Sequence, residues 1–333
     1  MSRISIIIPT LENTEALEST LLSVLERRPP RSEIVVVLGC VYTDPYGLKD
    51  EIRFVQAPDR STLVDLVNCG IAAARSEVVH VLACGATVDD GWTLSAVRRF
   101  EDPHVAAVAA VVLDATAPAR VIAAGSTWSW GGHSAASAHG CPVEAVGVIG
   151  RTWVGPHLAG AFYRRGAFVE LGSLDATLPA ELAAVDLALR MRHAGRHCVL
   201  DCESKIFVDP RLVGGDGFFR RSRHSERLFW RHARQRGWVR SLFAHGCRVA
   251  VEALTSIPRP WLVTQLVGRM AGLCDGTAPQ ISPIAPVAET NAATAVSNPA
   301  RRVDAAHKSP EERKKASRRS TGRHKRRQRK EII

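Results

Sequence analysis

The first forty residues hold two short, mostly apolar runs with a helical pattern between them. The runs are Ser5–Pro9 and Glu33–Val37, and neither alternates apolar with polar residues. Such runs predict strands buried on both faces, which are typical of parallel sheets covered by helices. Between them, leucines recur at helical spacing from Thr14 until the Pro29-Pro30 pair. A strand, a helix and a strand in this order predict an α/β fold.

The same alternation continues toward residue 200. We expect further strands at residues 52–55, 78–82, 105–113, 160–163 and 196–200, and helices at residues 61–74, 91–100, 165–171 and 181–194. Residues 125–141 are rich in Gly, Ser, Ala and His and are expected to form a loop. Residues 1–214 are therefore predicted to be one Rossmann-like α/β domain with a mainly parallel sheet flanked by helices.

The C-terminal third differs in composition and charge. Residues 215–275 mix arginines with aromatic and aliphatic residues and predict a basic amphipathic helical extension. Residues 276–333 are first rich in Pro, Ala and Thr and then basic, with few large apolar residues, which predicts a disordered tail. Residues 1–214 hold 19 Lys/Arg against 24 Asp/Glu, whereas residues 301–333 hold 14 against 4. We therefore expect any negatively charged partner to bind the C-terminal third.

Apolar stretches and cysteines in the sequence indicate where in the cell the protein is located. The N-terminal residues do not resemble a signal peptide, and no apolar stretch approaches the roughly 20 residues that span a bilayer. The eight cysteines are scattered singly, as is typical of reduced thiols. We expect a cytoplasmic protein, with the alternative of a peripheral position on the inner face of a membrane.

Several strings, in order, resemble family 2 glycosyltransferases. Ser5–Thr10 with the following helix and Glu33–Val37 are similar to the opening of that family, Leu158–Phe168 to its acceptor-side segment, and Val185–Arg190 to the helix that normally begins with Glu-Asp. The resemblance covers about residues 4–208. It implies a GT-A fold of the nucleotide-diphospho-sugar transferase type. It also implies sugar transfer from a nucleotide-sugar to an acceptor hydroxyl of a cell-envelope or lipid-linked glycan.

The charged motifs of that family are degenerate here. The Asp-Asp-Gly-Ser that normally follows the second strand is replaced by Leu38–Val41, and the DxD motif falls on Ala83-Cys84-Gly85. The Glu-Asp pair falls on Ala183-Ala184. Hard divalent cations need oxygen ligands, which these side chains do not supply. We therefore predict no cofactor, and no Mg²⁺ or Mn²⁺ held in the family's way, unless Asp89-Asp90 forms a shifted metal site instead of capping a helix.

The resemblance implies a nucleotide-sugar site at the carboxyl ends of the parallel strands. The residues expected there are Pro9, Thr10, Glu12, Leu38, Gly39, Asn68, Ala83, Cys84 and Gly85. Glu12 is equally explained as a turn or cap residue. The catalytic candidate is Asp186, a displaced base that takes the acceptor proton. Its alternative is an ion pair with Arg190 at i,i+4 spacing.

Two classes of function follow. The first is a glycosyltransferase-like protein that transfers sugar by a metal-independent route. The second is a catalytically inactive binding or adaptor protein that uses its basic C-terminal region. Residues 218–245 would either lie on an anionic membrane or pack on the domain's own surface. Residues 301–330 would contact a polyanion without sequence specificity.

Overall fold

A computed structural model describes residues 3–149, 153–213, 217–233, 237–256, 261–275 and residue 281. Residues 1–288 form one compact unit, to which all of these belong. The predicted tail at 276–333 lies, apart from Ile281, outside the described residues.

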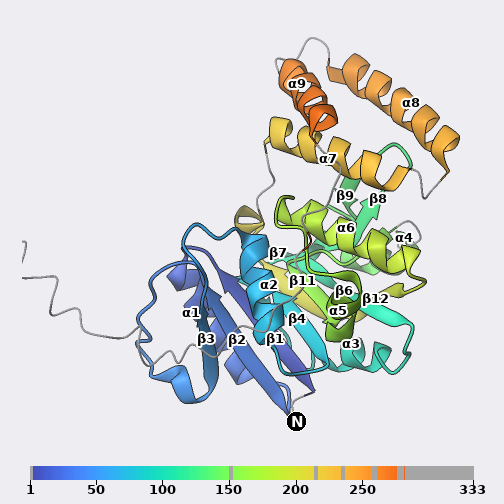
Figure 1. Cartoon of the computed structure of the whole chain (residues 1–333). Coiled ribbons are helices and arrows are strands. Elements are labelled where there is room, and N and C mark those ends of the chain that lie inside the picture. The colour runs from blue at the N-terminus through green and yellow to red at the C-terminus, as the bar shows by residue number, and fades with distance from the viewer. Residues whose placement is uncertain are drawn as a thin grey trace, which may run out of the picture. The chain divides into compact units, whose positions relative to one another are not determined.

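The N-terminal half of the large sheet is parallel, as predicted (Figure 1). Its central strand β1 (Ile4–Thr10) pairs with β2 (Ser32–Leu38) on one side and β4 (Val78–Leu82) on the other, and β3 (Ile52–Gln56) pairs with β2. All four strands run in the same direction, so their carboxyl ends meet at one edge of the sheet.

Beyond β4 the sheet becomes mixed, which the sequence did not predict. Strand β11 (Gly160–Arg164) lies antiparallel between β4 and β6 (Val105–Asp114), and β12 (His197–Val208) pairs with β6 in parallel. Two further strands, β5 (Thr87–Val88) on β12 and β7 (Ala117–Ala124) on β6, are antiparallel. The order is β3-β2-β1-β4-β11-β6-β12-β5, with β7 beside β6.

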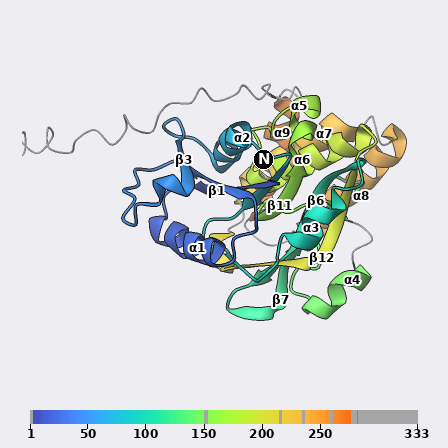
Figure 2. The same ribbon diagram turned by 90° about the horizontal axis from the view of Figure 1, so that it is seen from below.

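Helices cover both faces of this sheet. Alternate residues of β1 enter different cores: Ile7 packs with α2 (Leu63–Ala73) and α6 (Ala180–His193), whereas Ile6 and Ile8 pack with α1 (Thr14–Glu26) and α3 (Leu94–Arg99). This is the two-residue period of a strand buried on both sides. Figure 2 shows α1 and α2 on opposite sides of the sheet. The shorter helical elements are η1 (Leu48–Asp50), η2 (Val143–Ala145), α4 (Val146–Ile149), α5 (Arg165–Leu171) and η3 (Pro210–Leu212).

The loop predicted at residues 125–141 is instead largely a hairpin. Strands β8 (Ser126–Trp128) and β9 (Ser134–Ala136) pair with each other, and β10 (Trp153–Gly155) completes a small antiparallel sheet. Gly132 in the turn has a φ of 81°, and a Cβ there would lie 2.9 Å from Cβ of Phe229. The small residues that resemble a loop in sequence are needed because the turn packs closely against a helix.

The helical extension is confirmed. It consists of α7 (Phe218–Ala233), α8 (Trp238–Ser256) and α9 (Trp261–Cys274). Helices α7 and α9 approach closely because a Cβ on Gly268 or Gly272 would lie 2.6 Å from the carbonyl oxygen of Phe219 or 2.4 Å from that of Arg223. Within the part of the chain that the structure describes, no helix is both long and apolar enough to cross a bilayer.

Candidate functional site

The ends of β1, β2 and β4 lie together, as the sequence predicted for Pro9, Thr10, Leu38, Gly39, Ala83 and Cys84. The amide of Gly39 donates a hydrogen bond to the carbonyl oxygen of Thr10 at 2.8 Å. The thiol of Cys84, just beyond β4, donates to the carbonyl oxygen of Asn13 at 3.5 Å, which links β4 to the start of α1. Backbone, hydroxyl and thiol groups therefore line this edge of the sheet.

The two thiols at this edge have raised pKa values. Burial raises the pKa of Cys84, and the nearby hydroxyl of Thr10 opposes that shift. Burial and the negative charge of Glu12 raise the pKa of Cys40. Both thiols are consequently neutral near pH 7. Glu12 follows the end of β1 by two residues and is exposed.

Glu12 does not cap α1. The cap is Asn13, whose Oδ1 accepts a hydrogen bond from the amide of Ala16 at 2.9 Å. The exposed carboxylate of Glu12 is therefore available to a ligand at the strand ends, and its predicted contact with a nucleotide remains a proposal.

Gly85 cannot carry the carboxylate that a DxD motif would place there without strain. Its φ is 89°, and a Cβ at this position would lie 2.2 Å from Cδ1 of Leu212 in η3. Its amide donates to Oγ1 of Thr20 at 2.8 Å, so this backbone conformation is held by α1.

The residues present do not fit Mg²⁺ or Mn²⁺ at the end of β4. Ala83-Cys84-Gly85 offers one neutral thiol and no carboxylate. Asp89 and Asp90, the alternative pair, are exposed, and Asp90 lies 3.6 Å from Arg27. Across the described ranges, no group of three or more His, Cys, Asp or Glu side chains is placed to hold a metal ion.

Two polar side chains that sequence reasoning did not assign to the site follow β2. The Oη atom of Tyr42 and the Oδ2 atom of Asp44 are buried and have no hydrogen-bond partner among the described residues. Burial, with the charges of Glu18 and Asp44, raises the pKa of Tyr42 to about 12. The signal available in the sequence was a tyrosine in the loop after β2, a strand that ends at the predicted ligand edge.

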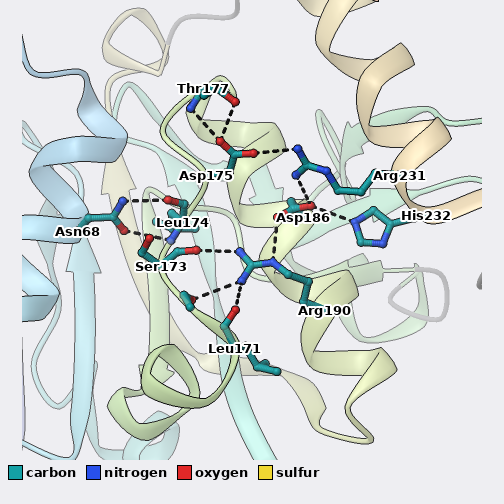
Figure 3. A network of polar contacts seen from close by, with 11 residues as sticks. Asn68, Leu171, Ser173, Leu174, Asp175, Thr177, Asp186, Arg190, Arg231 and His232 are labelled. Carbon is teal, nitrogen blue, oxygen red and sulfur yellow. Dashed lines mark hydrogen bonds and ion pairs between the residues drawn. The ribbon is translucent and has the colours of Figure 1, made fainter. Parts of the chain in front are cut away.

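Asn68 has partners on a different segment. Its Nδ2 donates to the carbonyl oxygen of Leu174 at 2.9 Å, and its Oδ1 accepts from the amide of Leu174 at 3.1 Å (Figure 3). These two bonds tie α2 to the loop before α6. The side-chain amide is therefore engaged in holding the domain together.

Asp186 lies in a network of buried charges (Figure 3). It has no exposed area, and its carboxylate accepts from Nε of Arg190, from Nη1 of Arg231, and pairs with Nε2 of His232, each at 2.9 Å. The ion pair with Arg190 confirms the structural alternative considered for Asp186. Arg190 also donates to the carbonyl oxygens of Leu171 and Ser173 at 2.6 and 2.9 Å.

The electrostatics of Asp186 do not suit a base. Burial raises the pKa of this carboxyl, but the hydrogen bond with His232 and the positive charges of Arg190 and Arg231 outweigh it and hold the pKa at about 2. A general base works best with a pKa near the operating pH and within reach of its substrate. Ala183 and Ala184, where the family's Glu-Asp pair falls, are both buried in the core.

A second carboxylate of α6, Glu181, lies in the first turn of that helix, beside β9. The amide of Ala83 donates to the carbonyl oxygen of Ala159 at 3.0 Å, which places the segment before β11 beside the end of β4. Burial lowers the pKa of His157 in this segment, and the charge of Glu181 opposes that shift. Glu181 is half-buried and accepts from Oγ of Ser134 at 2.9 Å. Sequence reasoning missed it because it does not align with the family's acidic pair.

Comparisons with known proteins agree with this geometry. Residues 5–168 match the model of glycosyl transferase family 2. No curated protein has a significantly matching sequence. Among solved structures, the mannosyltransferase PcManGT from Pyrobaculum calidifontis, in complex with GDP-Man and Mn²⁺, is similar with 16% identity and a TM-score of 0.51, over 82% of this chain and 86% of that chain.

GalNAc-T7, solved with UDP, GalNAc and Mn²⁺, is similar with 14% identity and a TM-score of 0.51. The match covers 68% of this chain and 48% of that chain. At these identities the two structures show a shared fold. The resemblance predicted from the sequence is confirmed: residues 5–168 match the glycosyl transferase family 2 model, and the chain shares the GT-A fold of these two glycosyltransferases.

Proposed function

We propose that this chain is a glycosyltransferase-like protein that binds a nucleotide-sugar at the ends of β1, β2 and β4 without a divalent cation. The family match supports a nucleotide-sugar ligand. So do the two similar structures, one of which was solved with GDP-Man and the other with UDP and GalNAc. The proposed binding residues are those of the strand ends, with Glu12, Tyr42 and Asp44 beside them.

The observation that carries this proposal is the pair of unsatisfied polar atoms after β2. Leaving a buried polar group without a partner costs about 1–3 kcal/mol. Oη of Tyr42 and Oδ2 of Asp44 are both buried without a partner, in the loop that follows β2. A nucleoside carries donors and acceptors on its base and ribose, so its binding would supply the missing hydrogen bonds.

Independence from a cation follows from the donor set. Both similar structures were solved with Mn²⁺. In this chain the residues after β4 supply no carboxylate, and Gly85 is held in a backbone conformation that disfavours one. We therefore assign no step of the reaction to a metal ion.

For sugar transfer, we propose Glu181 as the proton acceptor. The oxygen of an acceptor hydroxyl attacks the anomeric carbon, and the bond from that carbon to the diphosphate oxygen breaks. The nucleoside diphosphate leaves with the electron pair, and the hydroxyl proton passes to the carboxylate of Glu181. Ser134 donates a hydrogen bond to this carboxylate, and Arg221 lies 3.7 Å from it. Unlike Asp186, its side chain is 30% exposed, which gives an acceptor access. The proposed acceptor class is a cell-envelope or lipid-linked glycan.

The second candidate function is binding without turnover. It is favoured by Asp186, because the charged groups around that carboxylate leave it no catalytic role. In this case the domain would act as an adaptor that recognises a nucleotide-sugar and recruits partners through the C-terminal region.

One experiment separates these candidates. Calorimetric titration with UDP- and GDP-sugars, in Mn²⁺ and in EDTA, should show binding of one donor with the same affinity in both. Release of nucleoside diphosphate would then indicate transfer. Glu181→Gln should lower that release at least about 100-fold while donor affinity stays unchanged. The matched control is Glu144→Gln, an exposed carboxylate outside this site. Binding without release would favour the adaptor, and no binding of any donor would refute the proposal.

The C-terminal region supports a further part of the proposal, contact with an anionic surface. We propose a cytoplasmic protein that reaches the inner face of a membrane, with residues 301–330 as a polyanion-binding segment. Of the segment 218–245 expected on a membrane, α7 packs against α6 and α9, and Leu228 and Phe229 are 0% and 2% exposed. Helix α7 therefore packs on the protein's own surface. We propose that α8 and α9 make the membrane contact instead.

A further inference from the structure

Helices α8 and α9 expose apolar side chains on their outer sides. Twenty large apolar side chains are exposed among the described residues, and ten of them lie on these two helices of 19 and 14 residues. They are Trp238, Val239, Phe243, Val251 and Leu254 on α8, and Val263, Leu266, Val267, Met270 and Leu273 on α9. An apolar concentration of this kind marks an interaction surface.

Three ionisable side chains of the same helices, His245 and Glu252 of α8 and Arg269 of α9, are instead partly or fully buried. Glu226 of α7 is 2% exposed and accepts hydrogen bonds from Nε1 of Trp230 at 2.9 Å and Nη1 of Arg269 at 2.8 Å, and pairs with Nε2 of His245 at 3.0 Å. Arg269 of α9 also pairs with Glu252 of α8. These ionisable side chains are thus used to join the three helices. The usual distribution of a surface helix is reversed.

The exposed residues follow helical spacing. Val263, Val267 and Met270 are four and three residues apart, and Val239 and Phe243 are four apart, so each set lies on one side of its helix. In Figure 1, α8 and α9 lie on the far side of α7 from the large sheet. The exposed residues on these two sides are not covered by the described residues of the α/β domain.

Charge identifies the occupant of this surface. The acidic residues of α7 to α9 and the residue that follows, Glu226, Glu252 and Asp275, are each paired with an arginine. Arg220 and Arg240 are exposed, and the chain beyond α9 carries 14 Lys/Arg against 4 Asp/Glu at 301–333. Exposed cationic side chains on the helices that carry an apolar face complement an anionic lipid surface. A second copy of the chain would bring the same positive charges and be repelled.

We propose that α8 and α9 lie in the plane of an anionic lipid bilayer and insert their apolar sides into its interface. Trp238 and Phe243 would enter the boundary between headgroups and acyl chains, while Arg220, Arg240 and the basic segment contact lipid phosphates. This inference rests on the membrane contact of the proposed function and specifies which residues make it. Its test needs no nucleotide, so membrane binding and nucleotide-sugar binding can fail separately.

The test is flotation of the full chain with vesicles of phosphatidylcholine, with and without phosphatidylglycerol. Val239→Glu is compared with Val169→Glu, because the two valines are 80% and 77% exposed and only the first lies on α8. The wild-type chain should bind the anionic vesicles. Val239→Glu and Val267→Glu should each weaken that binding about tenfold or more, whereas Val169→Glu should leave it unchanged. Circular dichroism checks that each variant is folded.

Three results would overturn the proposal. The first is a wild-type chain that binds neither vesicle at low salt. The second is binding that high salt abolishes and that Val239→Glu does not alter, which would assign it to the basic segment alone. The third is a wild-type dimer in light scattering that Val239→Glu dissociates without any vesicle binding. That result would show that a second copy covers the face.

Discussion

Arg231 of α7 forms an ion pair with Asp186 of α6, with 2.9 Å between Nη1 and Oδ1, and the two side chains are 10% and 0% exposed. Through its other terminal nitrogen, Arg231 also bonds Oδ2 of Asp175 at 2.9 Å. Together with Arg190, this gives two carboxylates and two guanidinium groups, so the buried charge is balanced. These ion pairs attach α7 to the α/β domain. Removing either partner would strongly destabilise the protein, because it would leave an unpaired buried charge.

The first prediction concerns acid stability. The folded-state pKa of Asp186, about 2, lies below its ordinary value of 3.8. A lowered carboxyl pKa stabilises the folded state above the unfolded pKa, and this contribution is lost as pH falls through the folded pKa. It should amount to about 2 kcal/mol, lost between about pH 4 and pH 2. Urea unfolding of the wild type from about pH 5 to pH 2 should show this loss.

The matched variant is Asp186→Asn. It should be about 3–5 kcal/mol less stable than the wild type at neutral pH, because Arg190 and Arg231 lose their counter-charge in a buried site. It should also lack the corresponding part of the pH dependence. An equal pH slope in variant and wild type would contradict the assignment of that slope to Asp186.

The second prediction tests the unsatisfied hydroxyl of Tyr42. Tyr42→Phe removes a buried polar atom without a partner, so the free energy of unfolding should stay the same or rise by up to about 1 kcal/mol. Affinity for the nucleotide-sugar should fall about fivefold to tenfold in calorimetric titration. Tyr46→Phe in the same loop, where the ring is 66% exposed, should change neither quantity. Lower stability with unchanged affinity would show that the hydroxyl serves the fold instead.

The third prediction compares two glycines in helices. A Cβ at Gly268 would lie 2.6 Å from a backbone carbonyl of α7, whereas Gly246 of α8 has open space around it. Gly268→Ala should therefore destabilise the protein by about 1–3 kcal/mol. Gly246→Ala should stabilise it by up to about 1 kcal/mol, since alanine is the better helix former. Thermal unfolding of both variants measures the contrast, and equal effects would refute close packing of α7 on α9.

The fourth prediction uses thiol reactivity as a probe of the strand ends. Burial raises the pKa of Cys84, so little thiolate forms there at neutral pH, whereas Cys247 is exposed on α8. At about pH 7.5, iodoacetamide should modify Cys247 well before Cys84. A bound nucleotide-sugar should slow modification of Cys84 further and leave Cys247 unchanged. Peptide mass spectrometry measures the modification of both cysteines. If a nucleotide-sugar binds without protecting Cys84, its binding site lies away from the end of β4.

Much of the α/β fold was predictable because its elements are encoded locally. Ile6 to Ile8 and Val35 to Val37 are apolar without alternation, and each became a strand buried on both faces. The leucines of α1 recur at helical spacing, and Leu17 and Leu21 are buried. The edge where β1, β2 and β4 end followed from these elements, because parallel strands bring their carboxyl ends together.

The roles of single polar residues were less predictable. Asp186 was foreseen as a partner of Arg190 four residues away, but Arg231 and His232 lie 45 and 46 residues further along the chain. Their contacts turn an ambiguous carboxylate into a buried structural one. Glu181 and Tyr42 entered the candidate site for the same reason, since only folding places them beside residues distant in sequence.

The sequence alone indicated strands β1 to β4, β6, β11 and β12 and helices α1, α2, α3, α5 and α6. It also places Ala83, Gly85, Ala183 and Ala184 where the family resemblance leads us to expect carboxylates. Hydrophobic periodicity and residue identity are local properties, so no tertiary information was needed. Only the tertiary structure decided that β11 enters the sheet antiparallel between β4 and β6, and that α8 and α9 turn their apolar sides outward. An amphipathic helix has two sides, and its own sequence does not state which one faces the protein. Here the buried contacts of Glu226 with Arg269 and His245 made that choice.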